Sequence, residues 1–161
     1  MGNSGVSSLS WWFAAHPAWK AGEDWPQEVP VVCLETDDEI VLIDPFLPQD
    51  SSFDPRGKAV RVLLTQGAQP AGVEALELDG EPQQVVFFIR EHATLVTGDV
   101  LTGRDGVMRR SWTRPTASRC SPCERIAELP IERVIVPHCE TPVFVDGAAR
   151  TRAAVAEARH S

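Results

Sequence analysis

The chain has 161 residues, a formal net charge of −8 and a pI near 4.9, so its length is that of one globular domain. A phosphate backbone repels an acidic chain, and nucleic acid is therefore not an expected partner. No apolar run approaches the roughly 18 residues that a membrane span needs, so we expect no insertion into a membrane. The composition therefore excludes neither an enzyme nor a binding protein.

The N-terminal residues and the cysteines predict a cytoplasmic protein. The opening MGNSGVSSLSWW lacks the basic region and apolar core of a secretory signal. In that setting the four cysteines are expected to be reduced thiols: Cys33, Cys120, Cys123 and Cys139. Gly2 with a Ser at the right distance matches the N-myristoylation pattern, but chance matches to so short a pattern are common and we do not adopt it.

Residues 1–30 form a segment rich in tryptophan. Trp11, Trp12, Trp19 and Trp25 lie in it, whereas a disordered tail would be poor in aromatic residues. We therefore expect this segment to pack as a lid or an edge on a single domain that spans residues 1–161. A histidine in such a segment, here His16, serves packing more often than metal binding.

The rest of the chain predicts many strands and two or three helices. Residues 29–36 and 40–44 read as a hairpin around the turn DDE, and 59–65, 73–78, 83–89, 94–99 and 131–138 as further strands. Helices are expected at 122–129 and after Asp146, which resembles an N-cap. Residues 103–115 are predicted to be a solvated basic loop, and His92 an exposed turn residue. The pattern favours an α/β fold of packed layers.

Four segments carry a resemblance to a known family. In chain order they are EIVLIDPFLP, RVLLTQGAQPAG, TLVTGDVLTG and ERVIVPHCETPV. Their order and strand ends resemble the metallo-β-lactamase-fold hydrolases. The resemblance implies an α/β fold, the metallo-β-lactamase-like αββα sandwich, here truncated because the chain is short between Gly72 and Gln83.

The resemblance also assigns roles to individual residues. It implies that Asp99 and His138 match metal ligands, and that Asp44 supports the metal-binding turn from behind. Cys139 stands where a glycine is usual, and Glu81 stands at or near the position of another histidine. The His-x-His-x-Asp-His motif is missing, because its positions hold Gln66, Ala68, Pro70 and Ala71, which are poor zinc ligands.

The missing motif argues against two-metal hydrolysis, which needs two cations with a water held between them. We expect a degenerate, non-catalytic member that uses no cofactor and binds an unknown small molecule or protein partner. The alternative is a mononuclear hydrolase in which Asp99 and His138 hold one zinc, iron or manganese ion, with Glu81, His92 or Cys139 recruited. The sequence does not exclude a homodimer.

A third hypothesis rests on Cys120-Ser121-Pro122-Cys123. A C-x-x-C pair at the start of a helix can acquire thiolate character, because the helix dipole favours the anion. The spacing also suits half of a zinc site. However, a redox motif of the thioredoxin type follows a strand, whereas this pair follows the basic segment. We expect an ordinary pair of thiols.

Overall fold

The computed structural model describes residues 5–15, 28–43, 59–63, 69–78, 81–104, 106–110, 121–136 and 142–157. In these ranges the chain is mixed α/β and mostly strands, which agrees with the predicted class. No helix in these ranges is long and apolar enough to cross a membrane.

The first sheet contains four strands in the order β1-β2-β3-β4. They are β1 (Ser8–Ala15), β2 (Glu28–Glu35), β3 (Glu39–Ile43) and β4 (Ala59–Leu63). β2 and β3 form the predicted hairpin, whose turn is organised by the buried Thr36: its Oγ1 accepts the N–H of Glu39 at 3.0 Å. β4 pairs with β3 in parallel. β1, from the tryptophan-rich segment, is an edge strand of this sheet.

The second sheet contains five strands in the order β11-β10-β7-β6-β5. They are β5 (Val73–Leu78), β6 (Glu81–Ile89), β7 (Thr94–Val96), β10 (Arg133–Ile135) and β11 (Val143–Val145). β7 and β10 are parallel neighbours, and the other neighbouring pairs are antiparallel. Short 3-10 turns flank β7, at Arg90–His92 (η1) and at Gly98–Val100 (η2).

Two apolar layers cover the faces of the second sheet. In β6, Val85, Phe87 and Ile89 belong to one layer with Val32, Val41 and Ile43 of the first sheet, which packs the two sheets together. The alternate residues Val86 and Phe88 belong to a second layer with Ile126 and Ala154 of the helices. This alternation is the period of two expected of a strand buried on both faces.

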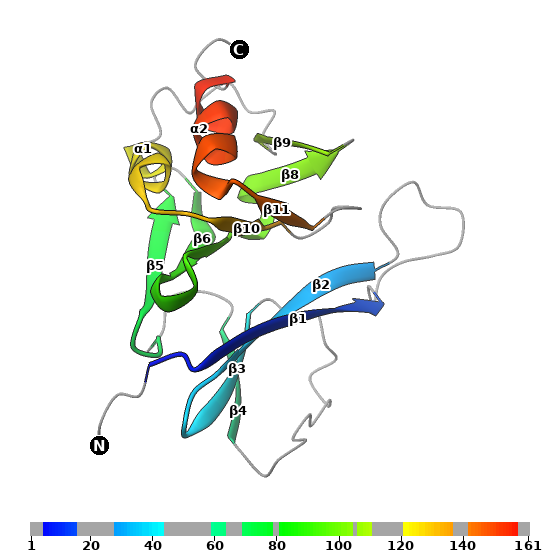
Figure 1. Ribbon diagram of the computed structural model, residues 1–161, viewed down its shortest axis with the longest axis vertical. Coiled ribbons are helices and arrows are strands. Elements are labelled where there is room, and N and C mark those ends of the chain that lie inside the picture. The colour runs from blue at the N-terminus through cyan, green and yellow to red at the C-terminus, as the bar shows by residue number, and fades with distance from the viewer. Residues whose placement is uncertain are drawn as a thin grey trace.

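The helices α1 (Ser121–Glu128) and α2 (Gly147–Glu157) lie on the side of the second sheet away from the first (Figure 1). Both were predicted. The described order of layers is thus helices, sheet, sheet. Val31, Ile40 and Leu42 on the outer face of the first sheet are also buried.

The structure corrects two local predictions. Within the segment predicted to be a basic loop, β8 (Leu101–Arg104) and β9 (Val107–Arg110) form an antiparallel hairpin. Leu101 and Met108 are buried in the apolar layer on the helix side, whereas Arg109 is exposed. These two apolar residues anchor the hairpin, but they are too few to indicate strands in the sequence. β11 was also missed, because three residues are too few to show a period.

Candidate functional site

Each of the two larger sheets contains one pair of parallel strands, and parallel strands finish at the same edge of a sheet. In the first sheet Ile43 at the end of β3 lies opposite Leu63 at the end of β4. In the second sheet Val96 at the end of β7 lies opposite Ile135 at the end of β10. The four segments that carry the family resemblance are these four strands with the residues that follow them.

The turn that leads into β5 contains Pro70 and Ala71, two positions that the sequence resemblance matches to metal ligands. Pro70 is buried, and its carbonyl oxygen accepts the N–H of Val73 at 3.1 Å. Ala71 forms a parallel bridge to Gly5. The carbonyl of Gly72 accepts the N–H of Arg90 at 2.8 Å. Backbone bonds to the N-terminal segment and to η1 therefore organise this turn.

Glu91 covers the same turn from outside. Gly72 has φ +82°, and a Cβ at this position would collide with the carboxylate of Glu91. A Cβ at Gly5 would lie 3.1 Å from Oε1 of the same carboxylate. The positive φ favours glycine at position 72, whereas the exposed end of the Glu91 side chain could move away from an added Cβ. Sequence reasoning missed Glu91; the available signal was the P-A-G turn of residues 70–72, which Glu91 covers in the structure.

The structure describes the backbone at Asp99 but not its side chain. Asp99 lies in η2, three residues after the end of β7. This turn is tied to β10, because the N–H of the buried Thr97 donates to the carbonyl of Ile135 at 3.1 Å. The chain into Asp99 and the chain that continues toward His138 thus leave adjacent strands at one edge. His138 itself lies outside the described residues, as do Asp44 and Cys139.

The structure places two of the proposed recruits, Glu81 and His92, relative to that edge. Glu81 is the first residue of β6, and Phe87 of the same strand lies opposite Val96. The register of β6 shifts near its start, so Glu81 pairs with Leu78 of β5 and Phe87 with Ala75, three residues of β5 away, which is about 10 Å. The side chain of Glu81 is not described, and its role stays a prediction.

His92 lies at the other end of β7 from Asp99, since β7 begins at Thr94. The structure therefore separates His92 from Asp99. It is also not the freely exposed residue that was predicted: it is partly buried and its Nε2 is fully buried. The carbonyl of His92 accepts the hydroxyl of Thr94 at 2.8 Å, which fixes the turn at the start of the strand.

The second cysteine of the C-x-x-C pair falls at the start of α1. The helix begins at Ser121, so Cys123 occupies its first turn, although its side chain is not described and Cys120 lies outside the described residues. Cys33 lies in β2 on the outer face of the first sheet, partly buried beside the cluster of Val31, Ile40 and Leu42.

Within the ranges that the structure describes, no three His, Cys, Asp or Glu side chains gather closely enough to hold a metal ion. Several of the candidate site residues lie outside those ranges: Asp44, Cys120, His138 and Cys139.

Comparison with solved structures identifies the fold. A metallo-beta-lactamase family protein from Thermus thermophilus superposes with a TM-score of 0.56, covering 94% of this chain and 79% of that one at 12% sequence identity. This chain has the metallo-beta-lactamase fold. At such low identity the likeness concerns the fold alone. Scans of protein-family models and of curated protein sequences found no match.

Proposed function

We propose that this chain is a shortened αββα metallo-β-lactamase-fold protein that does not carry out two-metal hydrolysis and instead binds a small ligand or a protein partner. The turn before β5 carries the proposal. Where the family places carboxylate and imidazole ligands, this turn has the buried Pro70 and the backbone-paired Ala71. Neither side chain has an atom that can bind a metal ion. We also propose that the protein is cytoplasmic.

Metal analysis tests this proposal. The protein is purified without chelator and without a histidine tag, and its metal content is measured by elemental analysis beside that of the Asp99→Ala/His138→Ala double variant. We expect less than about 0.1 equivalents of zinc, iron or manganese in both proteins, because two firm ligands do not make a tight site. Stoichiometric metal together with turnover of an ester or a lactam overturns the proposal.

The second candidate function is a mononuclear metal-dependent hydrolase, and the parallel pairing of β7 with β10 favours it. This pairing directs the chain toward Asp99 and toward His138 from one edge, with the Thr97–Ile135 hydrogen bond between the two strand ends. Here Asp99 and His138 would hold one ion and Asp99 would orient the water. About one metal ion per chain, lost in both Asp99→Ala and His138→Ala, supports this candidate; unchanged metal content in both variants removes it.

A thiol function at Cys120 and Cys123 is the third candidate, favoured by the start of α1 at Ser121. A helix N-terminus stabilises a nearby thiolate. Thiol titration decides it. A reactive thiol that titrates well below the ordinary range, with a reversible disulfide, supports the redox function, and two ordinary thiols without a disulfide exclude it.

A further inference from the structure

A hollow of about 560 Å³ lies beside the points where β10 and α2 begin. Residues of η1, the start of β10, the end of β11 and the first turns of α2 line it. It lies at the end of the second sheet where β7 and β10 begin, and Asp99 and the chain toward His138 follow the opposite ends of these strands. The hollow is therefore distinct from the edge that resembles a metal site.

Backbone hydrogen bonds make the walls of this hollow rigid. The N–H of Glu132 donates to the carbonyl of Ala93 at 2.8 Å, which joins η1 to β10. The first four N–H groups of α2, at residues 147–150, donate to the carbonyls of Ile131, Glu132 and Asp146 at distances of 2.7 to 3.1 Å. Because these N–H groups are already bonded, α2 does not present them to a bare anion such as phosphate. Side chains must therefore select the occupant.

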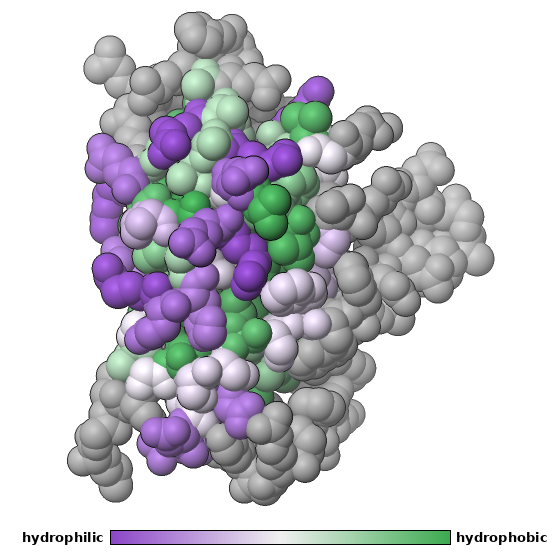
Figure 2. Space-filling view, viewed as in Figure 1, coloured by the Kyte–Doolittle hydropathy of each residue, from purple (hydrophilic) through white to green (hydrophobic). Residues whose placement is uncertain are grey.

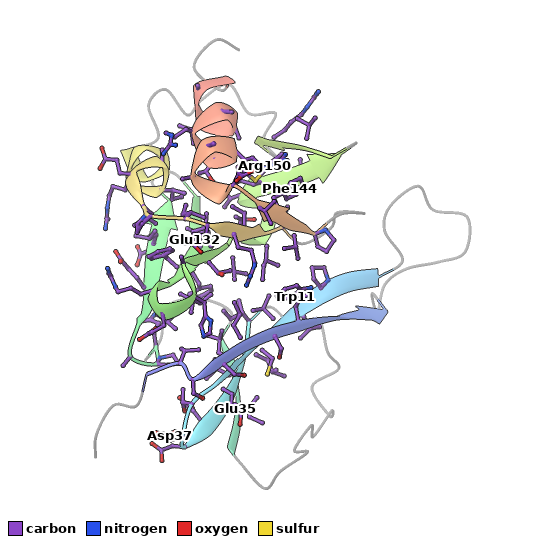
Figure 3. All side chains as sticks on the ribbon, viewed as in Figure 1. Trp11, Glu35, Asp37, Glu132, Phe144 and Arg150 are labelled. Atoms are coloured by element: carbon purple, nitrogen blue, oxygen red, sulfur yellow. The ribbon has the colours of Figure 1, made fainter. Side chains whose placement is uncertain are left out.

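Charged side chains of both signs line the hollow. Glu132, Asp146 and Arg152 are exposed, and within the described part of the chain none of them forms an ion pair. Figure 2 shows hydrophilic side chains gathered over this part of the visible face with hydrophobic ones among them, and Figure 3 places Glu132 beside the start of β10. Opposite charges at one hollow suit a molecule that itself carries both charges.

An apolar wall and a buried imidazole complete the lining. Val145 is 64% exposed, one of two large hydrophobic residues that are exposed in the described ranges. His92 contributes a buried Nε2 that has no hydrogen-bond partner among the described residues. Buried polar groups are normally bonded, but this nitrogen is closed off from the hollow, so the charged side chains and not the imidazole select the occupant.

The backbone next to the hollow is strained on both sides. Ala93 and Asp146 are the described non-glycine residues with positive φ, at 44° and 57°. Such conformations cost free energy and persist where the surrounding structure enforces them. Here these two residues set the direction in which the chain runs from η1 into β7 and from β11 into α2.

We propose that this hollow binds a small dipolar molecule of amino-acid size, with its carboxylate on Arg152, its ammonium group on Asp146 and Glu132, and an apolar side chain on Val145. The proposal does not rest on the function proposed above, because it concerns neither metal nor the opposite strand ends. The volume lies within the usual range for small-molecule sites, about 300–1,000 Å³.

Titration of the 15N-labelled full chain with L-leucine tests this proposal. We expect saturable amide shifts at residues 92–93, 131–133 and 145–152 below about 10 mM ligand. Two fragments separate the charges: 4-methylpentanoate lacks the ammonium group and 3-methylbutylamine lacks the carboxylate. Each fragment is expected to bind at least about ten-fold more weakly, because it loses one set of charge-assisted hydrogen bonds.

Matched variants locate the binding. Arg152→Gln and Asp146→Asn each remove one charge, and Asn tolerates the left-handed backbone at position 146. Each is expected to weaken leucine binding about ten-fold, while Arg125→Gln on α1, outside the hollow, leaves it unchanged. The proposal is overturned if leucine gives no saturable shift, if a fragment binds as tightly, or if both hollow variants bind like the Arg125→Gln control. The dispersion of the amide spectrum checks that each variant is folded.

Discussion

The guanidinium carbon of Arg133 lies 5.4 Å from the centroid of the Trp11 ring. Arg133 begins β10 in the second sheet, and Trp11 belongs to β1 at the edge of the first (Figure 3). This cation–π contact therefore joins the two sheets at their margin, where Trp11 also packs on the apolar layer between them.

The first prediction concerns the coupling between these two side chains. Arg133→Met keeps an apolar stem but removes the charge, and we expect it to lower the free energy of unfolding by about 0.5–1 kcal/mol. Trp11→Leu loses the ring as well as some apolar contact and should cost more, about 1–2 kcal/mol. In a double-mutant cycle measured by urea unfolding, the double variant should cost less than the sum of the single changes. Strict additivity would show that the contact contributes nothing to stability.

A second prediction separates backbone strain from steric collision at glycine. Gly106 has φ +72° with open space around its missing Cβ, whereas Gly72 has φ +82° with the Glu91 carboxylate against it. Gly106→Ala is expected to cost about 1 kcal/mol, from the backbone alone. Gly72→Ala should cost about the same, ~1 kcal/mol, because the exposed carboxylate of Glu91 ends a flexible side chain and can move away from the added Cβ. Adding Glu91→Ala to Gly72→Ala should therefore recover little stability in urea unfolding; a recovery of more than about 1 kcal/mol would show instead that the collision is costly.

The third prediction compares two buried threonines whose hydroxyl groups differ in their bonding. Oγ1 of Thr36 accepts the N–H groups of Glu39 at 3.0 Å and Asp38 at 3.3 Å, whereas Oγ1 of Thr151 has no partner among the described residues. Thr36→Val leaves donors unsatisfied and should destabilise the protein by about 1–2 kcal/mol. Thr151→Val removes an unbonded buried hydroxyl and should be neutral or stabilising by up to about 1 kcal/mol. Equal losses in thermal unfolding would refute this contrast.

The fourth prediction concerns the attachment of the β8–β9 hairpin to α2. Arg150 donates to the carbonyl of Val145 at 3.0 Å and to that of Gly106 at 3.1 Å, and its guanidinium carbon lies 5.4 Å from the Phe144 ring. Arg150→Met breaks these bonds, so hydrogen exchange at residues 106–110 should accelerate by about ten-fold or more. Arg152→Met on the same helix is the control and should leave exchange unchanged. Faster exchange in both variants would mean that the helix propensity of α2, and not the hydrogen bonds of Arg150, decides the exchange rate of the hairpin.

The sequence alone predicted the strands that show a clear apolar period and the family resemblance of their ends. Continuous or alternating apolar runs identified β2, β3, β5 and β6, and the alanine-rich segment after Asp146 identified α2. These elements could be predicted because local spacing decides which face of a strand or helix is buried. The absent histidine motif was equally plain, since it depends only on residue identity.

Tertiary structure decided what depends on distant partners. β8, β9 and β11 are too short for a period, and they exist because the hairpin packs under α2 and β11 pairs with β10. Asp146 directly precedes α2, where the sequence predicted an N-cap, and its carbonyl accepts the N–H groups of Ala149 and Arg150, but its left-handed φ of 57° could not be predicted from local spacing. Likewise only the parallel pairing of β7 with β10 brings the chain into Asp99 and the chain toward His138 to one edge, because strand direction in a sheet follows from how the whole chain packs and not from local spacing.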